Sequence, residues 1–421
     1  MRGLYKRRIL IKYASYSCIT YSEVGFILSH RFSVGWWPSG GTPTLARRQS
    51  RTECLLEPSL RYNPALNGLR AIAAMLVIAD HCRVPGLSGG YFGVDLFFVL
   101  SGYLITRLLA EEFSARGSVD LPGFYLRRIL RLTPPLMLML AAYLALAPSL
   151  WPWYSLKAHV RDAALAGFYL SDYAHAYWLR PTMLLHTWSL AVEEHFYLIW
   201  PLAVLLLARV PFRRRIAWLA GLYLLATAWR SIEYLHLGWD IAYFSFDTRL
   251  SGLVLGALLA TGLPHVGRVS QETADGAGII ACVILATCLT MSSWGTPSAM
   301  VWMMTLVELA AAAILIAASV ESSWVSKLLS TPPLVGIGLI SYGLYLWHYP
   351  AAVFFRTQLP WYQTWPLVLV FALTAATASY ILVERPLQRY RRGLTARRRG
   401  VRVSDGEPIA VPVGAVASRR L

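Results

Sequence analysis

Long apolar stretches separated by short basic segments dominate the hydrophobic pattern of the chain. The first two, 64–82 and 90–109, are joined by a short turn containing Pro and Gly, and each is long enough to cross a hydrocarbon core of about 30 Å. They predict a transmembrane hairpin. Further apolar stretches follow at 133–150, 194–210, 215–232, 245–262, 276–291, 301–320, 335–355 and 365–383. The pattern therefore predicts an all-α polytopic membrane protein, a bundle of about ten transmembrane helices.

One more apolar stretch, 157–173, is a weaker candidate for a membrane span. It contains Lys157, His159, Arg161, Asp162 and Asp172. If it crossed, the basic cluster near residue 213 and the arginine-rich tail would lie on opposite sides of the membrane, whereas cytoplasmic loops normally share the excess of Lys and Arg. We therefore expect 157–173 to be re-entrant or surface-lying. The N- and C-termini are then both cytoplasmic, in a multi-pass protein of the inner (plasma) membrane.

Composition agrees with a membrane protein. Of the 421 residues, 56% are hydrophobic and only 14% are charged, compared with about 25% charged residues in soluble domains. The net charge of +17 comes from basic residues in loops and tails, which positive-inside topology explains better than nucleic-acid binding. The five cysteines show no spacing typical of a zinc site or a disulfide framework. We expect no metal and no permanently bound cofactor.

Three regions differ in character along the chain. Residues 1–60 are predicted to form a disordered N-terminal extension, because their apolar run is interrupted by polar residues; a start codon assigned upstream of the true one is an alternative explanation. Residues 61–386 hold the apolar spans and are expected to form the membrane domain. Residues 387–421 are predicted to form a basic cytoplasmic tail that contacts anionic lipid.

The first apolar stretch carries ionisable residues that need an explanation. Such groups cost about 2.5 to 3.5 kcal/mol each at the centre of a bilayer. Arg70 and His81 are eleven residues apart, so they share a helix face and lie roughly 16 Å apart along the axis. The residues between them on that face are small, which leaves room for a ligand or another helix. Asp80 points about 100° away from His81 and is not expected to be its partner.

Several motifs follow this Arg and His in a fixed order. They are GYFGVDLFFVLSGYLI from Gly90, RRILR at 127–131, HTWSLAVEEHFYLIWP from His186 and SYGLYLWHYP from Ser341. Together, over about 63–386, the chain closely resembles the acyltransferase 3 family of integral-membrane acyltransferases. The resemblance implies a membrane O-acyltransferase that moves an acyl group, most often acetyl, from cytoplasmic acyl-CoA to a hydroxyl of a carbohydrate-containing acceptor.

Four arginines are candidates for binding the acyl-CoA donor: Arg70, Arg127, Arg128 and Arg131. The phosphates of CoA need cationic partners. A basic loop is more often only a positive-inside signal, and Arg70 is equally explained by snorkelling to the inner interface. The resemblance to the family shifts the interpretation of these residues toward a CoA site.

His81 is the candidate catalytic base. Acyl transfer to a hydroxyl needs a base near pH 7, and the unperturbed pKa of histidine, about 6.5, suits that role. A hydrogen bond between helices is the alternative explanation. Glu193 and Glu194, at the outer start of their span, are expected to orient His81 and stabilise its imidazolium form. Their alternative role is to stabilise the helix through its macrodipole.

A further set of residues is expected to border the acceptor: His186, Trp188, Asp247, Arg249, Tyr345 and His348. The aromatic members are equally explained as anchors at the membrane interface. The family often has an acid at the position of Ser251, so any role assigned to that position is open.

Two other classes of function compete with the enzyme. A transporter or flippase of a glycan or lipid would also need charged residues in its spans, but the second half of the chain shows no inverted repeat of the first hairpin. A non-catalytic membrane scaffold would leave Arg70, His81 and the RRILR motif without a common purpose. The candidate site residues are compatible with acetyl and with longer acyl groups. They are also compatible with an acyl-His81 intermediate.

Overall fold

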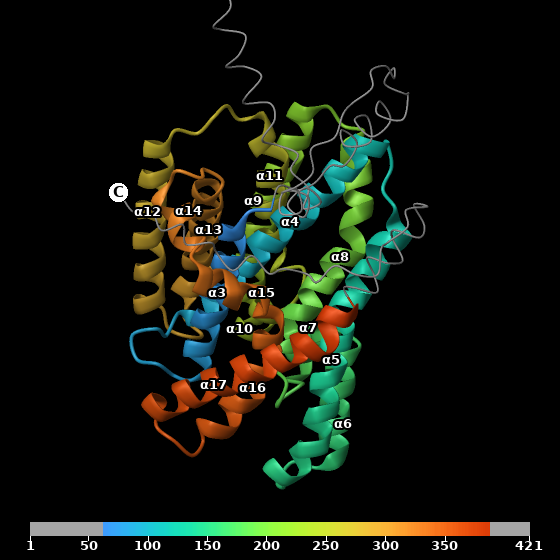
Figure 1. Cartoon of the computed structure of the whole chain (residues 1–421), viewed down its shortest axis with the longest axis vertical. Helices are drawn as coiled ribbons and strands as arrows, with labels where there is room; N and C mark the ends of the chain where they lie inside the picture. The colour runs from blue at the N-terminus through green and yellow to red at the C-terminus, as the bar shows by residue number, and fades with distance from the viewer. Residues whose placement is uncertain (1–61, 388–421) are drawn as a thin grey trace, which may run out of the picture. The chain divides into compact units, whose positions relative to one another are not determined.

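The computed structural model describes residues 62–387, and helices are their only regular secondary structure (Figure 1). This agrees with the predicted all-α class. The predicted N-terminal extension and all but the first residue of the predicted basic tail lie outside the described residues.

The predicted hairpin is formed by α3 (Pro64–His81) and α4 (Gly93–Arg116), joined through the short 3-10 helix η1 (Gly90–Phe92). The Asn63 side chain caps α3 by accepting a hydrogen bond from the Ala65 amide, and Pro64 occupies the first turn, where its missing N–H costs nothing. At the other end, Gly117 terminates α4 with φ 68°, a left-handed conformation that favours glycine.

The remaining α-helices complete the described range. In order they are α5 (Leu121–Leu150), α6 (Leu156–Gly167), α7 (Ser171–Trp178), α8 (Thr187–Ala208), α9 (Phe212–Leu237), α10 (Trp239–Phe244), α11 (Leu250–Gly262), α12 (Gln271–Met291), α13 (Met304–Ala318), α14 (Trp324–Leu329), α15 (Pro332–Leu339), α16 (Ser341–Phe355) and α17 (Trp361–Ser379). Figure 1 shows α12 beside α13, and α16 beside α17 at the lower end of the view.

Six helical segments of the described range are long and apolar enough to cross a membrane: Gly90–Arg116, Leu121–Leu150, Thr187–Ala208, Gln271–Met291, Ala299–Ala318 and Trp361–Leu387. Helices also occupy the other four predicted spans, as α3, α9, α11 and the pair α15 and α16. These are shorter, more charged or interrupted, as at Ile340 between α15 and α16. Six spans are thus supported by length and composition, and the count of about ten with cytoplasmic termini stays a proposal.

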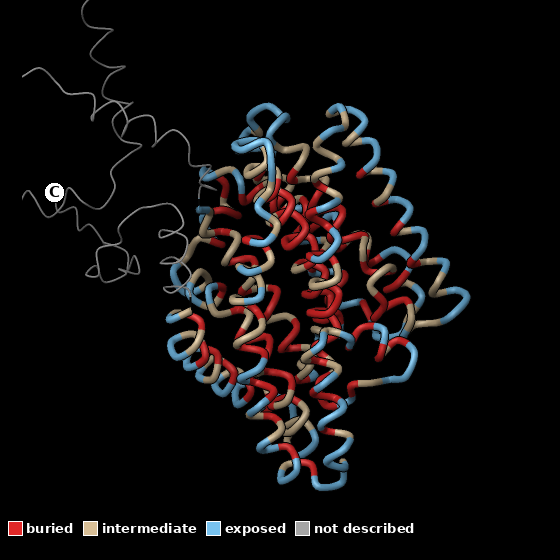
Figure 2. Tube along the Cα trace, turned by 90° about the vertical axis from the view of Figure 1, so that its right-hand side faces the viewer, coloured by how far each residue is buried: buried red, intermediate tan, exposed pale blue. Residues whose placement is uncertain are grey.

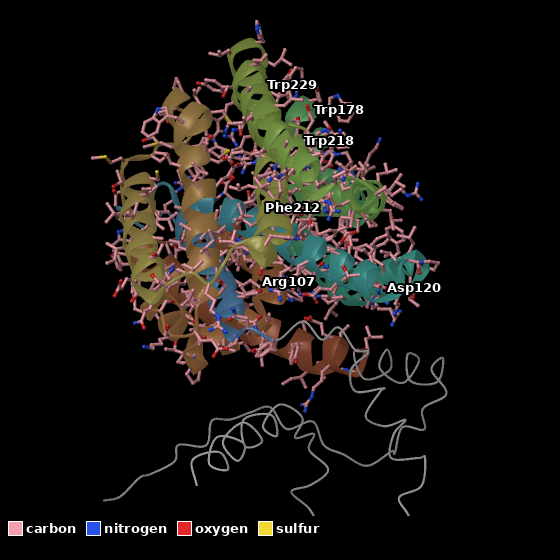
Figure 3. The ribbon with its side chains drawn as sticks, turned by 90° about the horizontal axis from the view of Figure 1, so that it is seen from above. Arg107, Asp120, Trp178, Phe212, Trp218 and Trp229 are labelled. Carbon is pink, nitrogen blue, oxygen red and sulfur yellow. The ribbon has the colours of Figure 1, made fainter. Side chains whose placement is uncertain are left out.

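The outer faces of several helices expose large apolar side chains. Leu198, Leu202 and Leu206 recur every four residues on α8 and are all more than half exposed. Figure 2 shows buried segments in the interior and exposed segments along the outside, and Figure 3 shows Trp218 and Trp229 along α9. Apolar patches of this extent are typical of a surface that faces lipid.

Two glycines let neighbouring helices approach α3 closely. A Cβ atom on Gly68 would collide with the carbonyl oxygen of Leu329, at the end of α14. A Cβ atom on Gly338, in α15, would collide with the carbonyl oxygen of Asn67. Helix α3 is therefore packed tightly on two sides, which fixes the position of the helix that carries Arg70 and His81.

The segment predicted to be re-entrant or surface-lying forms two short helices. With 12 and 8 residues, α6 and α7 reach only about 18 and 12 Å, less than the hydrocarbon core of about 30 Å. Neither helix is long enough to cross the bilayer alone, in agreement with the prediction from loop charge.

This geometry predicts that a cysteine replacing Trp178, at the end of α7 and 71% exposed, reacts with a membrane-impermeant maleimide in intact cells. The measurement uses a background from which the five native cysteines have been removed. Arg213→Cys is the matched control and should label only after permeabilisation. Labelling of both positions only after permeabilisation would place α7 on the cytoplasmic side and overturn the proposed topology.

Candidate active site

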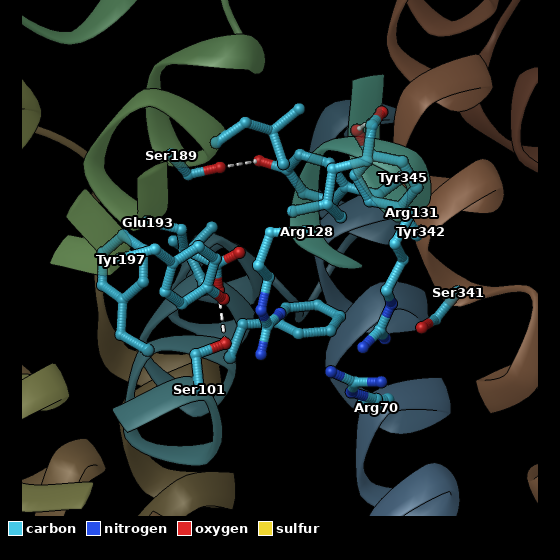
Figure 4. Close-up of a pocket in the computed structure, with 15 residues that line it drawn as sticks. Arg70, Ser101, Arg128, Arg131, Ser189, Glu193, Tyr197, Ser341, Tyr342 and Tyr345 are labelled. Carbon is cyan, nitrogen blue, oxygen red and sulfur yellow. Dashed lines mark hydrogen bonds between the residues drawn. The ribbon is translucent and has the colours of Figure 1, made fainter. Parts of the chain in front are cut away.

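A cavity inside the bundle brings together several residues singled out from the sequence (Figure 4). Side chains from α3, α4, α5, α8 and α16 form its wall. The lining residues include Arg70, Ser101, Arg128, Arg131, Ser189, Glu193, Tyr197, Ser341, Tyr342 and Tyr345. Five of the predicted site residues therefore share one cavity, although they come from four helices.

One side of the cavity is cationic, since Arg70, Arg128 and Arg131 all line it (Figure 4). The guanidinium of Arg128 lies 4.5 Å from the ring centroid of Tyr197. Stacking on an aromatic face holds a guanidinium in place and leaves its N–H groups free to donate in the ring plane. Three arginines that converge from two helices are suited to bind an anionic ligand.

The RRILR motif is helical, which corrects the expectation that it lies in a loop. Helix α5 begins at Leu121, where the Asp120 side chain caps it by accepting from the Gly123 amide. Residues three apart share a helix face, so Arg128 and Arg131 both reach the cavity. Arg127 points away and forms surface ion pairs with Glu112 and Asp120, at 3.6 and 3.8 Å.

Glu193 lies on the wall of the same cavity, where its Oε1 accepts a hydrogen bond from Ser101 Oγ at 2.6 Å. Glu194, the next residue, is not among the lining residues. Within residues 62–387, the side-chain hydrogen-bond partner of His81 is His348 rather than either carboxylate. The structure therefore does not contain the expected pairing of a glutamate with His81.

His81, at the end of α3, belongs to a cluster of histidine and tyrosine rings. Its Nδ1 lies 2.9 Å from Nε2 of His348, and the two ring planes are nearly parallel, 16° apart, with their centroids 5.1 Å apart. The ring of Tyr349 packs edge-on against His81, with the centroids 4.8 Å apart. The Arg356 guanidinium donates to the His81 carbonyl oxygen at 3.3 Å.

The hydrogen bonds of this cluster specify the tautomer of His81. His348 Nδ1 lies 2.6 Å from the Tyr345 carbonyl oxygen, which only accepts, so Nδ1 of His348 carries a proton. Nε2 of the neutral ring must then accept from His81, which requires the proton of His81 to be on Nδ1. The lone pair of His81 is thus on Nε2. Some side-chain nitrogens of the described residues are buried without a hydrogen-bond partner, and Nε2 of His81 is not one of them.

Tyr345 joins the cavity to the histidine cluster. Its side chain lines the cavity, where its hydroxyl lies 2.6 Å from Ser189 Oγ and donates to the carbonyl oxygen of His186 at 3.0 Å. Its own carbonyl oxygen accepts from His348. The cationic cavity and the His81 cluster are therefore neighbouring parts of one site.

Two residues expected to border an entrance for the acceptor are buried instead. His186 and Trp188 are 1% and 4% exposed. The ring of His186 stacks on Tyr349, and its Nε2 lies 3.2 Å from the Leu346 carbonyl oxygen. In this structure both side chains are packed inside the protein next to the site, so they do not form an entrance.

Arg249 and Asp247 also have partners within the protein. Arg249 forms a buried ion pair with Asp95, at 2.7 Å, and lies over the ring of Tyr243, so its guanidinium does not face an open acceptor site. Asp247 accepts hydrogen bonds from Tyr173 and Trp229, at 3.0 and 2.7 Å. Neither residue lines the cavity.

A second buried ion pair includes Ser251 as a neighbour, a position whose role the sequence left open. Ser251 Oγ donates to Glu308 at 2.6 Å, and Arg230 Nη1 contacts both Ser251 Oγ and Glu308 Oε1 at 2.8 Å. The acid that pairs with Arg230 therefore comes from α13, and Ser251 joins the pair as a hydrogen-bonding neighbour.

Some members of the site were not predicted from the sequence. Ser189, Tyr197, Tyr342 and Ser101 line the cavity, and Tyr349 and Arg356 contact His81. Most of them belong to the quoted motifs, since Ser189 and Tyr197 lie in the motif that starts at His186 and Tyr349 directly follows His348. Their position in a motif was the available signal, but it does not say which side chain faces inward.

Comparison with known proteins places this site in a family context. The family model for an acyltransferase domain matches residues 63–384. The O-acetyltransferase OatA of Staphylococcus aureus is 35% identical over 365 residues, covering 80% of this chain and 59% of that protein. The peptidoglycan O-acetyltransferase OatA of Listeria monocytogenes is 34% identical over 356 residues, covering 79% and 56%. The chain thus spans less than two thirds of the length of these curated relatives, and no solved structure matches it.

Proposed function

Because the chain belongs to the acyltransferase 3 family, we propose that it transfers an acetyl group from cytoplasmic acetyl-CoA to a hydroxyl of a carbohydrate. The names of its relatives, which describe O-acetyltransferases and in one case a peptidoglycan O-acetyltransferase, support both the group and the class of acceptor. The observation that carries the proposal is the arrangement of the site, in which a cavity with three arginines adjoins a histidine pair with a defined proton pattern.

The cationic side of the cavity suits the donor. Arg70, Arg128 and Arg131 would bind its phosphates or polarise the carbonyls of its pantetheine arm. Arg70 and His81 lie eleven residues apart on α3, or roughly 16 Å along the axis. Pantetheine, which extends like a peptide of four or five residues, reaches about 15 Å. A donor held at the arginines would therefore bring its thioester close to His81.

His81 is proposed to act as the base through Nε2. It takes the proton of the acceptor hydroxyl while the hydroxyl oxygen attacks the thioester carbonyl, so a C–O bond forms and the C–S bond breaks. The proton then passes from His81 to the departing CoA thiolate. His348 would act as a positioning residue, because its Nε2 accepts from His81 Nδ1 and keeps the lone pair of His81 on the opposite nitrogen.

The other predicted site residues take supporting parts in this proposal. Glu193 would balance the charge of the arginines and accept the hydrogen bond from Ser101. Glu194 is the next residue of α8 and lies outside the lining of the cavity. Tyr345 would form the wall between donor and acceptor, and His186 would support Tyr349. The proposed setting is the inner (plasma) membrane, with about ten spans and cytoplasmic termini.

Replacing Arg128 with Ala is expected to raise the KM for acetyl-CoA by about tenfold or more, because a hydrogen bond to a charged group contributes about 1.5 to 3 kcal/mol. Arg128→Lys should rescue binding only in part, since an ammonium cannot stack on Tyr197 as a planar guanidinium does. The measurement is steady-state kinetics on purified protein.

Arg127→Ala is the matched control in the same motif. Among the residues that the structure describes, Arg127 forms two surface ion pairs, which contribute about 1 kcal/mol or less each. The KM of the Arg127→Ala variant should therefore stay within about threefold of the wild-type value. Equal effects at the two positions would argue that the motif serves topology alone.

The proposed function is tested by extracting surface carbohydrate from cells with the gene, without it, and with a His81→Ala allele. We expect base-labile acetyl esters only on carbohydrate from cells with the wild-type gene. Unchanged ester content in all three strains would reject the proposal. Loss of the carbohydrate itself from the surface would instead favour the transporter alternative.

A further inference from the structure

A second, larger cavity adjoins the cavity lined by Arg70, Arg128, Arg131 and Glu193, which we call the reaction cavity. We call the larger cavity the vestibule; its volume is about 660 Å³, within the usual range of small-molecule sites of about 300 to 1,000 Å³. It is lined by the start of α3, the middle of α4 and the region from the end of α13 to the end of α14. Arg70 lines both cavities and therefore lies between them.

The vestibule is polar and mainly cationic. Arg70, Arg107 and Lys327 line it from three different helices, and Glu321 is the acid among its lining residues. A neighbouring hollow of about 450 Å³ shares Tyr103, Arg107 and Ser319 with it, and adds Arg268. Positive side chains that converge on a hollow of this size indicate an anionic ligand larger than a single phosphate.

Arg107 is held in a fixed orientation inside the vestibule. Its Nε donates to Glu111 Oε1 and its Nη1 donates to the Tyr103 hydroxyl, both at 2.8 Å. Within the described part of the chain no residue accepts from Nη2, which leaves that nitrogen for a ligand. Lys327, on α14, is exposed and adds a flexible charge. The start of α3 adds the positive end of a helix dipole, with the Asn63 and Asn67 side chains beside it.

We propose that the vestibule binds the phosphorylated nucleotide end of the acyl-CoA donor, an inference that rests on the proposed function. Arg107 and Lys327 contact the 3′-phosphate of the nucleotide, the diphosphate lies at Arg70, and the pantetheine arm extends from Arg70 into the reaction cavity. The donor then occupies both hollows at once, with its anionic end in the wide cationic one and its thioester in the narrow one. Arg128 and Arg131 act farther in, on the pantetheine side.

The test compares donors that have and lack the nucleotide. Wild-type protein and the double variant Arg107→Gln/Lys327→Gln are purified and placed in nanodiscs of phosphatidylcholine. Kd is measured for CoA and dephospho-CoA, and kcat/KM for acetyl-CoA and acetyl-pantetheine. We expect the double variant to bind CoA about tenfold or more weakly, with a matching loss in kcat/KM for acetyl-CoA. Its loss with acetyl-pantetheine should be much smaller, because that donor has no nucleotide.

Arg213→Gln is the matched control, since Arg213 is an exposed residue of α9 that lines none of these cavities. It should bind CoA as the wild type does. Normal CoA binding by the double variant, or an equal loss with both donors, would overturn the vestibule proposal. Wild-type protein that binds and uses no thioester at all would instead reject the proposed function.

Anionic lipid headgroups share the chemistry of the CoA phosphates and are the other source of a ligand for this site. Repeating the CoA titration in nanodiscs that contain phosphatidylglycerol separates the two sources. If the site is a donor site, CoA affinity changes little with lipid composition and depends on Arg107 and Lys327 in both lipids. If phosphatidylglycerol abolishes CoA binding in wild-type protein, the vestibule is a lipid site and the proposal is wrong.

Discussion

His81→Gln is expected to lower acetyl transfer by at least a hundredfold while CoA binding stays near its wild-type value. General-base catalysis contributes about 10²- to 10⁴-fold, and the Gln amide can hydrogen-bond to His348 but cannot accept a proton at neutral pH. His81 lies at the opposite end of α3 from the vestibule, so donor affinity should not depend on it. Turnover and CoA affinity are measured on the same purified preparations.

Two further variants show whether the loss is specific. His265→Gln changes an exposed histidine outside the cavity and should leave turnover unchanged. His348→Ala removes the acceptor for His81 Nδ1, so it should lose less activity than His81→Gln but clearly more than the control. If His81→Gln kept more than about a tenth of wild-type turnover, His81 would be structural and the mechanism would be wrong.

Of the variants described, Asp95→Asn is expected to lower the free energy of unfolding most. Asp95 and Arg249 form an ion pair at 2.7 Å in which both side chains are 1% exposed. Removing one partner of a buried pair costs about 3 to 5 kcal/mol, because the other charge stays buried without compensation. The expected result is a lower yield of folded protein and a free energy of unfolding in detergent reduced by about that amount.

Arg116→Gln provides the comparison for a surface pair. Arg116 and Glu112 lie 3.5 Å apart, and the arginine side chain is 50% exposed, so the expected cost is about 1 kcal/mol or less. Equal destabilisation by the two variants would contradict the assignment of Asp95 and Arg249 as a pair that the membrane domain needs for folding.

The local part of the site was predictable from the sequence because its residues are close in the chain. The hydrophobic pattern predicted the hairpin of α3 and α4, and the helical period predicted that Arg70 and His81 are far apart on one face. Loop charge predicted that 157–173 does not cross the bilayer, and the segment forms two helices that are each too short to cross it alone. Each of these inferences depends on helical geometry alone.

The partner of His81 was not predictable in that way, because His348 is 267 positions away in the chain. Its position depends on how α16 packs against α3, which the helical pattern does not specify. The expected pairing of Glu193 with His81 is absent because the two residues lie at different levels along the bundle. Glu193 follows His186 by seven residues, so it lies about 10 Å farther along α8. His186 is the residue that lies close to His348, with the ring centroids 5.6 Å apart. That spacing places Glu193 beside Ser101 in the cavity rather than beside His81.

The most direct test of the account uses purified protein in proteoliposomes with acetyl-CoA labelled in its acetyl group and a carbohydrate acceptor. The account predicts that wild-type protein moves the label onto the acceptor as a base-labile ester, with release of one CoA thiol for each ester formed, and that His81→Gln forms neither product. Transport of unmodified carbohydrate without ester formation, or equal ester formation by wild-type and His81→Gln protein, would contradict it.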